Sequence, residues 1–102
     1  MKTVFVSGTF NVLHPGHLRL LRFAKECGDY LIVAVNSDRI AANSAHVHEH
    51  LRLEGVQSIG WVDKAFVCDD ALVDTIAHFR PDVVVKGKEH ELRFNINKIL
   101  IN

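Results

Sequence analysis

Two histidines, His14 and His17, lie three residues apart with Pro15 and Gly16 between them, just ahead of a segment with helical periodicity. The first turn of a helix has free backbone N–H groups and the positive end of the helix dipole, so it forms a cradle for an anion. Two imidazoles within one turn add donors that can be aimed at the same phosphate. A side chain at position 16 would crowd that phosphate, which is the expected reason for Gly16. Gly8 is expected to let the chain leave the preceding strand sharply. The alternative interpretation is that the histidines cap the helix or lie on the surface.

The elements on either side of this motif are a strand, a helix and a second strand. Alternating Val and Phe residues predict a strand over residues 2–7. Apolar residues at three- and four-residue spacing predict a helix over residues 17–27, with Pro15 in its first turn and Gly28 as a left-handed stop. The β-branched run over residues 30–35 is typical of a strand covered on both faces in a parallel sheet. Together these elements predict a right-handed βαβ unit.

The rest of the chain continues the alternation of strands and helices. Residues 37–49 are polar and indicate a loop with a ragged turn. The other expected elements are a helix over 50–58 weakened by Gly55, a strand over 61–67, a helix over 69–79 capped by Asp69 or Asp70, and a strand over 82–86 after Pro81. This order predicts an α/β fold with a doubly wound parallel sheet, Rossmann-like, in a single domain over residues 1–102. Ligands in such folds bind beyond the carboxyl ends of the strands, where the strand order reverses.

Composition and charge narrow the classes of protein. The 102 residues suffice for one hydrophobic core. Twelve Lys and Arg balance twelve Asp and Glu, which argues against a nucleic-acid binder that relies on excess positive charge. The longest apolar run covers residues 31–35 and no secretory signal is evident, so we expect a cytoplasmic protein without membrane contact. Cys27 and Cys68 are expected to be reduced and buried, and no dedicated metal ligands are expected.

The segment around His14 and His17, residues 8–17, resembles the signature of a known family. Gly-Thr-Phe-Asp-x-x-His-x-Gly-His marks the nucleotidyltransferase superfamily that includes glycerol-3-phosphate cytidylyltransferases and the adenylyltransferase domain of ADP-heptose synthases, and it is matched by Gly8-Thr9-Phe10-Asn11-Val12-Leu13-His14-Pro15-Gly16-His17. The resemblance continues over residues 20–38, Leu51-Arg52, Val62-Asp63 and residues 81–87. It therefore covers most of the chain, and its order agrees with the independently predicted strands and helices.

The resemblance implies transfer of a nucleoside monophosphate from ATP or CTP to a small phosphorylated acceptor, such as a sugar phosphate or glycerol phosphate. An acceptor phosphate oxygen attacks the α-phosphorus and pyrophosphate leaves. Catalysis of such transfers comes mainly from positioning and charge stabilisation. His14 and His17 are then the catalytic residues, expected to donate hydrogen bonds to the phosphates. Mg²⁺ is the expected cofactor, held by substrate oxygens and water, and a homodimer is a possible assembly.

The resemblance also implies a set of nucleotide-binding residues. Thr9 and Phe10 are expected to line the nucleotide site, and Asp38 to contact ribose or substrate. Arg52 and Lys86 are the cations expected near phosphate. The full implied set is Gly8, Thr9, Phe10, Gly16, Asp38, Arg52, Lys86 and Gly87. For the charged members the alternative is a solvated surface charge or a turn cap.

Three features depart from the family pattern. Asn11 stands where most members have Asp, although related adenylyltransferases acting on nicotinamide mononucleotide also have Asn. Where the family has one or two lysines after the second strand, this chain has Arg39 before a histidine-rich segment, so Arg39 or a protonated histidine substitutes or the site is weakened. The family's Ile-Ser-Thr-Thr-like segment is absent, and the apolar residues 99–101 read as interrupted, so we expect a fragment of a longer protein.

Two other functions remain open on the sequence. The cluster of His46, His48, Glu49 and His50 has spacing that places two ligands on one side of a strand or helix, as in a metal-binding module. A nucleotide-binding domain that has lost catalysis and serves a regulatory role is the second. The nucleotide also stays open, since residues 81–87 favour the ATP-using branch and the compact chain is equally similar to the CTP-using one.

Overall fold

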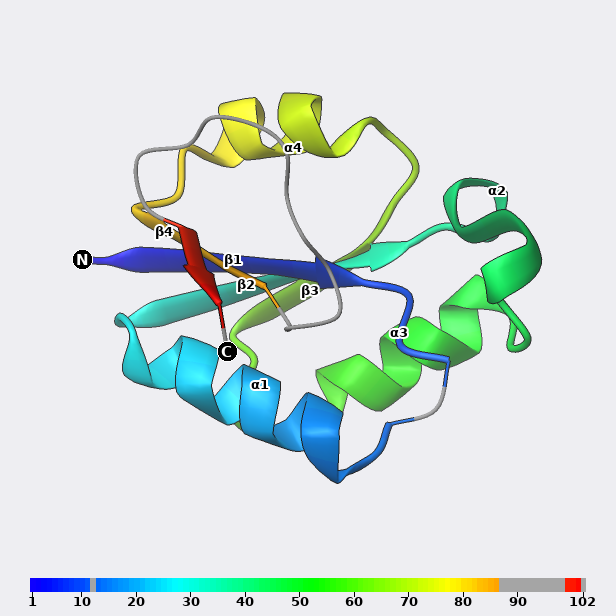
Figure 1. Ribbon diagram of the computed structural model, residues 1–102, viewed down its shortest axis with the longest axis horizontal. Coiled ribbons are helices and arrows are strands. Elements are labelled where there is room, and N and C mark those ends of the chain that lie inside the picture. The colour runs from blue at the N-terminus through cyan, green and yellow to red at the C-terminus, as the bar shows by residue number, and fades with distance from the viewer. Residues whose placement is uncertain (12, 87–98, 102) are drawn as a thin grey trace.

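The computed structural model describes residues 1–11, 13–86 and 99–101, with side chains described up to residue 85. Strands and helices alternate along the chain (Figure 1). In chain order they are β1 (Thr3–Gly8), α1 (Pro15–Glu26), β2 (Tyr30–Asn36), α2 (Asp38–Ala41), the 3₁₀ helix η1 (Ala42–Ser44), α3 (Glu49–Gln57), β3 (Lys64–Cys68), α4 (Leu72–Phe79), β4 (Val83–Lys86) and β5 (Ile99–Ile101). Among the described helices none is long and apolar enough to cross a membrane.

The strands form one parallel sheet in the order β3-β2-β1-β4-β5. β1 lies at the centre, between β2 and β4, with Val4 opposite both Leu31 and Val83. The chain first moves outward from β1 to β3 and then crosses to the other side of β1, so the strand order reverses between β1 and β4. The predicted doubly wound α/β sheet in a single domain is therefore confirmed, and its ligand-binding crevice is expected beyond the carboxyl end of β1.

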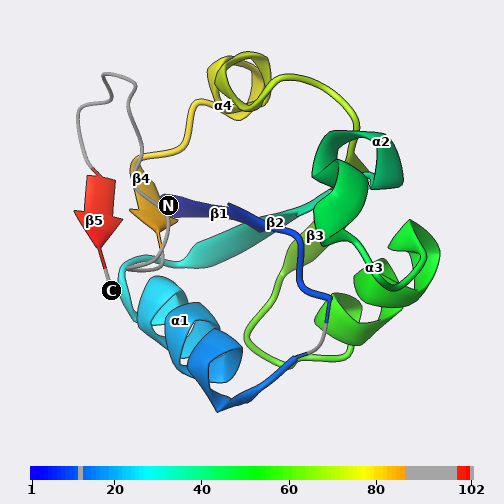
Figure 2. The ribbon, with the colours of Figure 1, turned by 45° about the vertical axis from the view of Figure 1, so that its right-hand side comes forward.

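Side chains that alternate along the strands build a core on each face of the sheet. Val4 and Val6 of β1 pack with Leu21 of α1 and Val56 of α3, whereas Phe5 packs on the opposite face beside Phe79 of α4. Figures 1 and 2 show α1 and α3 covering one face and α4 the other. Because both faces are covered, the strands read as nearly continuous apolar runs rather than as alternating ones.

The end of α1 differs from the expectation of a left-handed glycine. Cys27 closes α1 in a right-handed conformation, and no described glycine has a positive φ. Gly28 is needed for a different reason, because a Cβ there would lie 2.8 Å from the Lys2 carbonyl oxygen and 2.7 Å from Val4 Cγ2. The glycine therefore lets the turn after α1 pass close to the start of β1.

Other sequence predictions are corrected in detail. Neither Asp69 nor Asp70 caps α4, because its N-cap is Ala71, which forms no side-chain cap bond. The expected loop over 37–49 contains α2 and η1. Residues 99–101 form the strand β5, which pairs with β4. Cys68 is buried as expected, but Cys27 is only half-buried, and burial raises the pKa of its thiol. Both cysteines are free.

Candidate phosphate-binding site

The loop that leaves β1 is held by an aromatic ring rather than by a turn at Gly8. Gly8 itself has no positive φ, whereas Phe10, two residues later, has a φ of 54°. The Phe10 ring is 5% exposed and folds back over Gly8, where a Cβ would lie 3.0 Å from it. The Phe10 ring also contacts the His17 ring edge-on, at 5.4 Å between centroids. Phe10 therefore anchors the loop, and Gly8 is small because the ring occupies the space above it.

His14 and His17 form a reciprocal cap at the start of α1. His14 is the N-cap residue, and its Nδ1 accepts from the Gly16 amide at 3.0 Å. His17 Nδ1 accepts from the His14 amide at a longer 3.4 Å, and the two rings stack with centroids 4.0 Å apart. With Nδ1 accepting in both rings, the proton of each neutral imidazole lies on Nε2. The alternative interpretation, that the histidines cap the helix, is therefore confirmed, and donation by His14 and His17 to a phosphate stays a prediction.

Gly16 has a role in this cap that the sequence did not show. A Cβ on Gly16 would lie 2.7 Å from His14 Cε1 and 3.0 Å from His14 Nδ1. A larger residue would push the His14 imidazole off the helix start, even with no ligand bound. The predicted crowding of a phosphate stays a prediction.

Arg52 is buried and its guanidinium is bonded to the protein. The side chain is 0% exposed, so the alternative interpretation of a solvated surface charge is wrong for Arg52. Its Nε donates to the Val47 carbonyl at 2.7 Å, and Nη1 donates to the carbonyls of Thr9 at 2.8 Å and Asn36 at 2.6 Å. Nη2 donates to Asp38 Oδ1 at 2.8 Å. Arg52 therefore ties the carboxyl ends of β1 and β2 to the segment that enters α3, and a phosphate contact by Arg52 remains untested.

Asp38, the first residue of α2, pairs with Arg52. The hydrogen bond from Arg52 is the main reason why the pKa of Asp38 is lowered from its ordinary value. Its other carboxylate oxygen lies 3.6 Å from Nε2 of His48, which precedes α3. The predicted contact of Asp38 with ribose stays a prediction, and the structure shows that this carboxylate already has two basic neighbours.

Asp69 joins the carboxyl end of β3 to that of β2. Its Oδ1 accepts from Ser37 Oγ at 2.6 Å and from Arg39 Nε at 3.0 Å, and these bonds, that of Ser37 first, lower the pKa of Asp69. Ser37 Oγ in turn caps α2 through the Ile40 amide. The bonds of Asp69 with Ser37 and Arg39 were missed from the sequence because Asp69 or Asp70 was expected to cap the helix over 69–79. The Ser-Asp-Arg run at the end of a strand was the available signal for a polar cluster at this edge.

Thr9 and Asn36 lie side by side at the ends of β1 and β2. Asn36 Nδ2 donates to Thr9 Oγ1 at 3.3 Å. Thr9 is thus fixed through its hydroxyl and its carbonyl, at the sheet edge where it was expected to line a nucleotide. Lys86 is the last residue of β4 and pairs in register with Ile101 of β5, while its side chain and Gly87 lie outside the described residues.

The described side chains do not supply a metal cage. No group of three or more His, Cys, Asp or Glu side chains that could hold a metal ion occurs in the described ranges. In the histidine segment, His48 Nδ1 accepts from the His50 amide, and His48 Nε2 faces Asp38, so both nitrogens of this ring have protein neighbours. The described residues therefore do not form an Mg²⁺ site of their own.

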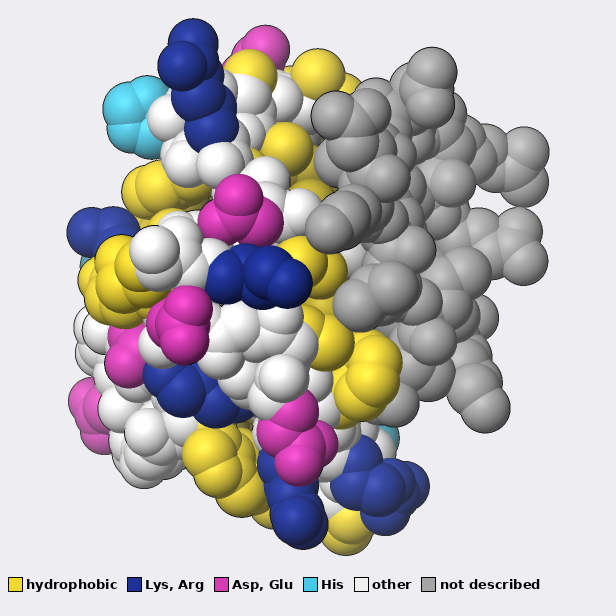
Figure 3. Space-filling model, turned by 90° about the vertical axis from the view of Figure 1, so that its left-hand side faces the viewer, with side chains coloured by type: hydrophobic (Ala, Val, Ile, Leu, Met, Phe, Trp, Pro, Cys, Tyr) yellow, Lys and Arg dark blue, Asp and Glu magenta, His cyan; other side chains and the backbone are white. Residues whose placement is uncertain are grey.

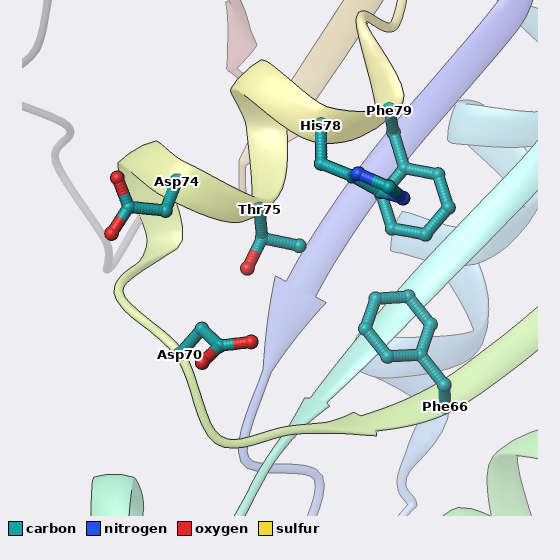
Figure 4. Close-up of a pocket in the computed structure, with 6 residues that line it drawn as sticks. All are labelled: Phe66, Asp70, Asp74, Thr75, His78 and Phe79. Atoms are coloured by element: carbon teal, nitrogen blue, oxygen red, sulfur yellow. The ribbon is translucent and has the colours of Figure 1, made fainter.

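A pocket of about 330 Å³ lies away from this loop, between α4 and the end of β3 (Figure 4). It is lined by Phe66, Asp70, Asp74, Thr75, His78 and Phe79. None of the residues predicted to bind nucleotide is among them. The strands begin at the end of the sheet that lies opposite to the loop with His14 and His17. The surface at that end carries charges of both signs together with apolar side chains (Figure 3).

The fold and site define an α/β domain with a parallel sheet. After its central strand, β1, the chain enters a helix whose first turn carries two histidines, and the strand order reverses at this strand. Residues 5–102 match the family model described as "Cytidylyltransferase-like". The chain belongs to this cytidylyltransferase-like family, as the sequence motif predicted.

Relatives and solved structures agree with this assignment. The chain is 39% identical over 99 residues to the bifunctional protein HldE of Marinomonas sp., covering 89% of this chain and 20% of that protein. It is 36% identical over 105 residues to the FAD synthase of Methanosarcina barkeri, covering 97% of this chain and 72% of that enzyme. The chain thus spans about a fifth of the HldE relatives and most of the FAD synthases. A lipopolysaccharide core biosynthesis protein from Thermoplasma volcanium has the same fold, with a TM-score of 0.90, 26% identity, and coverage of 99% of this chain and 95% of that one.

Proposed function

We propose that this protein is a nucleotidyltransferase that moves a nucleoside monophosphate from ATP or CTP to a small phosphorylated acceptor. The observation that carries the proposal is the geometry of His14 and His17, whose shared cap leaves the proton of each neutral imidazole on Nε2 at a helix N-terminus. Relatives named FAD synthase and HldE, and the family itself, support transfer of a nucleotidyl group.

In the proposed reaction a phosphate oxygen of the acceptor attacks the α-phosphorus of the triphosphate. The new P–O bond forms as the bond to the β-phosphate bridge oxygen breaks, and pyrophosphate leaves with that electron pair. Negative charge grows on the non-bridging and leaving oxygens. Donors that are already oriented stabilise such charge without reorganisation, and His14 and His17 meet that requirement because their rings are fixed by backbone N–H groups.

The first experiment measures ligand-induced stabilisation. ATP, CTP, GTP and UTP, each with Mg²⁺, are compared with their nucleosides by thermal unfolding. A triphosphate at 100 times its dissociation constant adds about 2.7 kcal/mol to the free energy of unfolding. We expect one triphosphate to raise the melting temperature well above the effect of its nucleoside. Equal shifts for both, or none for any, would remove the support for a phosphate site.

A binding-only domain is the second candidate, and the burial of Arg52 favours it. Of the cations expected near the triphosphate, Arg52 is bonded to Thr9, Asn36, Val47 and Asp38. Pyrophosphate release with a panel of sugar phosphates and glycerol phosphate separates the candidates. Stabilisation by a triphosphate without release of pyrophosphate in the presence of any acceptor would favour the binding-only function.

A further inference from the structure

Asn11 joins two segments that are far apart in the sequence. Its side-chain Nδ2 donates to the Ser44 carbonyl oxygen at the end of η1. Its Oδ1 accepts from the His46 amide at 2.8 Å. One carboxamide thus bonds both a backbone carbonyl and a backbone N–H of the segment between η1 and α3. Figure 2 shows the loop after β1 passing beside α2 and α3, where these bonds form.

The two bonds determine which chemical group can occupy this position. A carboxamide has one acceptor oxygen and one donor nitrogen, and only one orientation of it matches a carbonyl on one side and an N–H on the other. An ionised carboxylate has no donor, so its second oxygen would face the Ser44 carbonyl oxygen. An apolar side chain of the same shape would leave both backbone groups without these partners.

Arg52 also holds this segment. Its bonds to the Val47 and Thr9 carbonyls connect the segment again to the loop after β1. The contacts of Asn11 lie at residues 44 and 46, and that of Arg52 at residue 47. The segment that carries His46 and His48 is therefore attached to the loop of the candidate site at successive points.

We propose that Asn11 is a positioning residue whose carboxamide holds residues 44–46 against the loop that carries His14 and His17, and that Asp at this position breaks the attachment. Asn11 thereby sets the place of the histidine segment beside the candidate site. Asn11 stands where most family members have Asp, and in this chain the carboxamide has two partners, the Ser44 carbonyl and the His46 amide. On this proposal the exchange of Asp for Asn is not neutral. The functional consequence rests on the proposed function, whereas the attachment itself does not.

The attachment is tested without any nucleotide. Hydrogen exchange of the His46 amide is measured in the wild type, in Asn11→Leu and in Asn11→Asp. We expect Asn11→Leu to speed exchange at His46 about tenfold, because the amide loses its acceptor, while amides in β2 are unchanged. Asn43→Leu is the matched control, because it changes a nearby exposed Asn that has no side-chain bond among the described contacts. Unchanged exchange at His46 in Asn11→Leu would overturn the proposal.

The pH dependence of Asn11→Asp identifies the donor half of the contact. At pH 7.5 the carboxylate faces the Ser44 carbonyl, so we expect a melting temperature about 4–8 °C below that of the wild type, from the loss of one hydrogen bond. A protonated carboxyl group can donate again, so the difference from the wild type should shrink at pH 4.5. A difference that is the same at both pH values would show that Nδ2 makes no required contact.

Binding of the triphosphate forms a separate measurement. If the proposed function holds, Asn11→Leu should weaken stabilisation by the best triphosphate more than Asn43→Leu does. If Asn11→Leu speeds exchange at His46 but no triphosphate stabilises even the wild type, the proposed function is refuted, while the inference that Asn11 attaches residues 44–46 still stands. Normal triphosphate binding by an Asn11→Leu protein with fast exchange at His46 would refute the positioning role.

Discussion

Replacement of Arg52 by Lys tests whether this residue is a structural tie or a phosphate ligand. Lys keeps the positive charge but places three donors on one nitrogen, whereas the guanidinium bonds three carbonyls and a carboxylate in a fixed plane. A solvent-facing phosphate contact would tolerate Lys without a change in folding. A buried tie would not, because at least one of the carbonyls of Thr9 and Asn36 loses its donor.

The expected loss follows from those bonds. Each buried acceptor left without a partner costs about 1–3 kcal/mol. The Asp38 carboxylate is 42% exposed and can rehydrate, so its lost ion pair adds little to the expected loss of stability. For one such acceptor we expect Arg52→Lys to lower the free energy of unfolding by about 2 kcal/mol, and Arg52→Leu by about 3–5 kcal/mol. For a domain of this size the smaller loss corresponds to a melting temperature about 8–16 °C lower.

The assay is thermal and urea unfolding without ligand, with Arg39→Lys as the matched control. Arg39 is also paired with an aspartate, but its side chain is 68% exposed. Its replacement should change stability by less than about 0.5 kcal/mol. An Arg52→Lys protein as stable as Arg39→Lys would refute the structural role and return Arg52 to the predicted phosphate contact.

The remaining predictions concern the histidines, a tight turn and an ion pair. His14→Ala and His17→Ala should each lower pyrophosphate release by about two to three orders of magnitude in a chain that turns over, with His78→Ala as control, and near-wild-type rates in both would end the catalytic assignment. Gly28→Ala should cost about 1–3 kcal/mol in urea unfolding, because its Cβ meets the Lys2 carbonyl, whereas Gly60→Ala, with nothing within 4 Å, should be neutral. The pKa of Asp63 is lowered mainly by the hydrogen bond from Lys25 and then by that from the Leu31 amide. The ionised carboxylate therefore stabilises the fold above about pH 4, and this stabilisation is lost as the pH falls through the lowered pKa. In Asp63→Asn the free energy of unfolding should accordingly fall less steeply between neutral and acid pH than in the wild type.

The sequence predicted the fold because its signals are local. Apolar periodicity, Pro15 at the first position of α1, and the β-branched runs of β1, β2 and β4 each reflect conformational preference over a few residues. The alternation of these elements restricts the topology to a parallel, doubly wound sheet. The motif around His14 and His17 was likewise readable, because its residues are neighbours in the chain and cap one helix.

The tertiary structure alone decided how residues from separate segments meet. From the sequence, Arg52 was expected near phosphate and Asp69 or Asp70 at a helix cap, yet the partners of Arg52 and Asp69 lie at the ends of other strands. The reason for Gly28 is also distant, since its turn packs on the start of β1. Parallel strands bring their carboxyl ends to one edge whatever their separation in sequence, and buried carbonyls there must find donors. That requirement is set by three-dimensional proximity, so local sequence patterns determined the elements and the packing of the sheet edge determined what Arg52 and Asn11 bind.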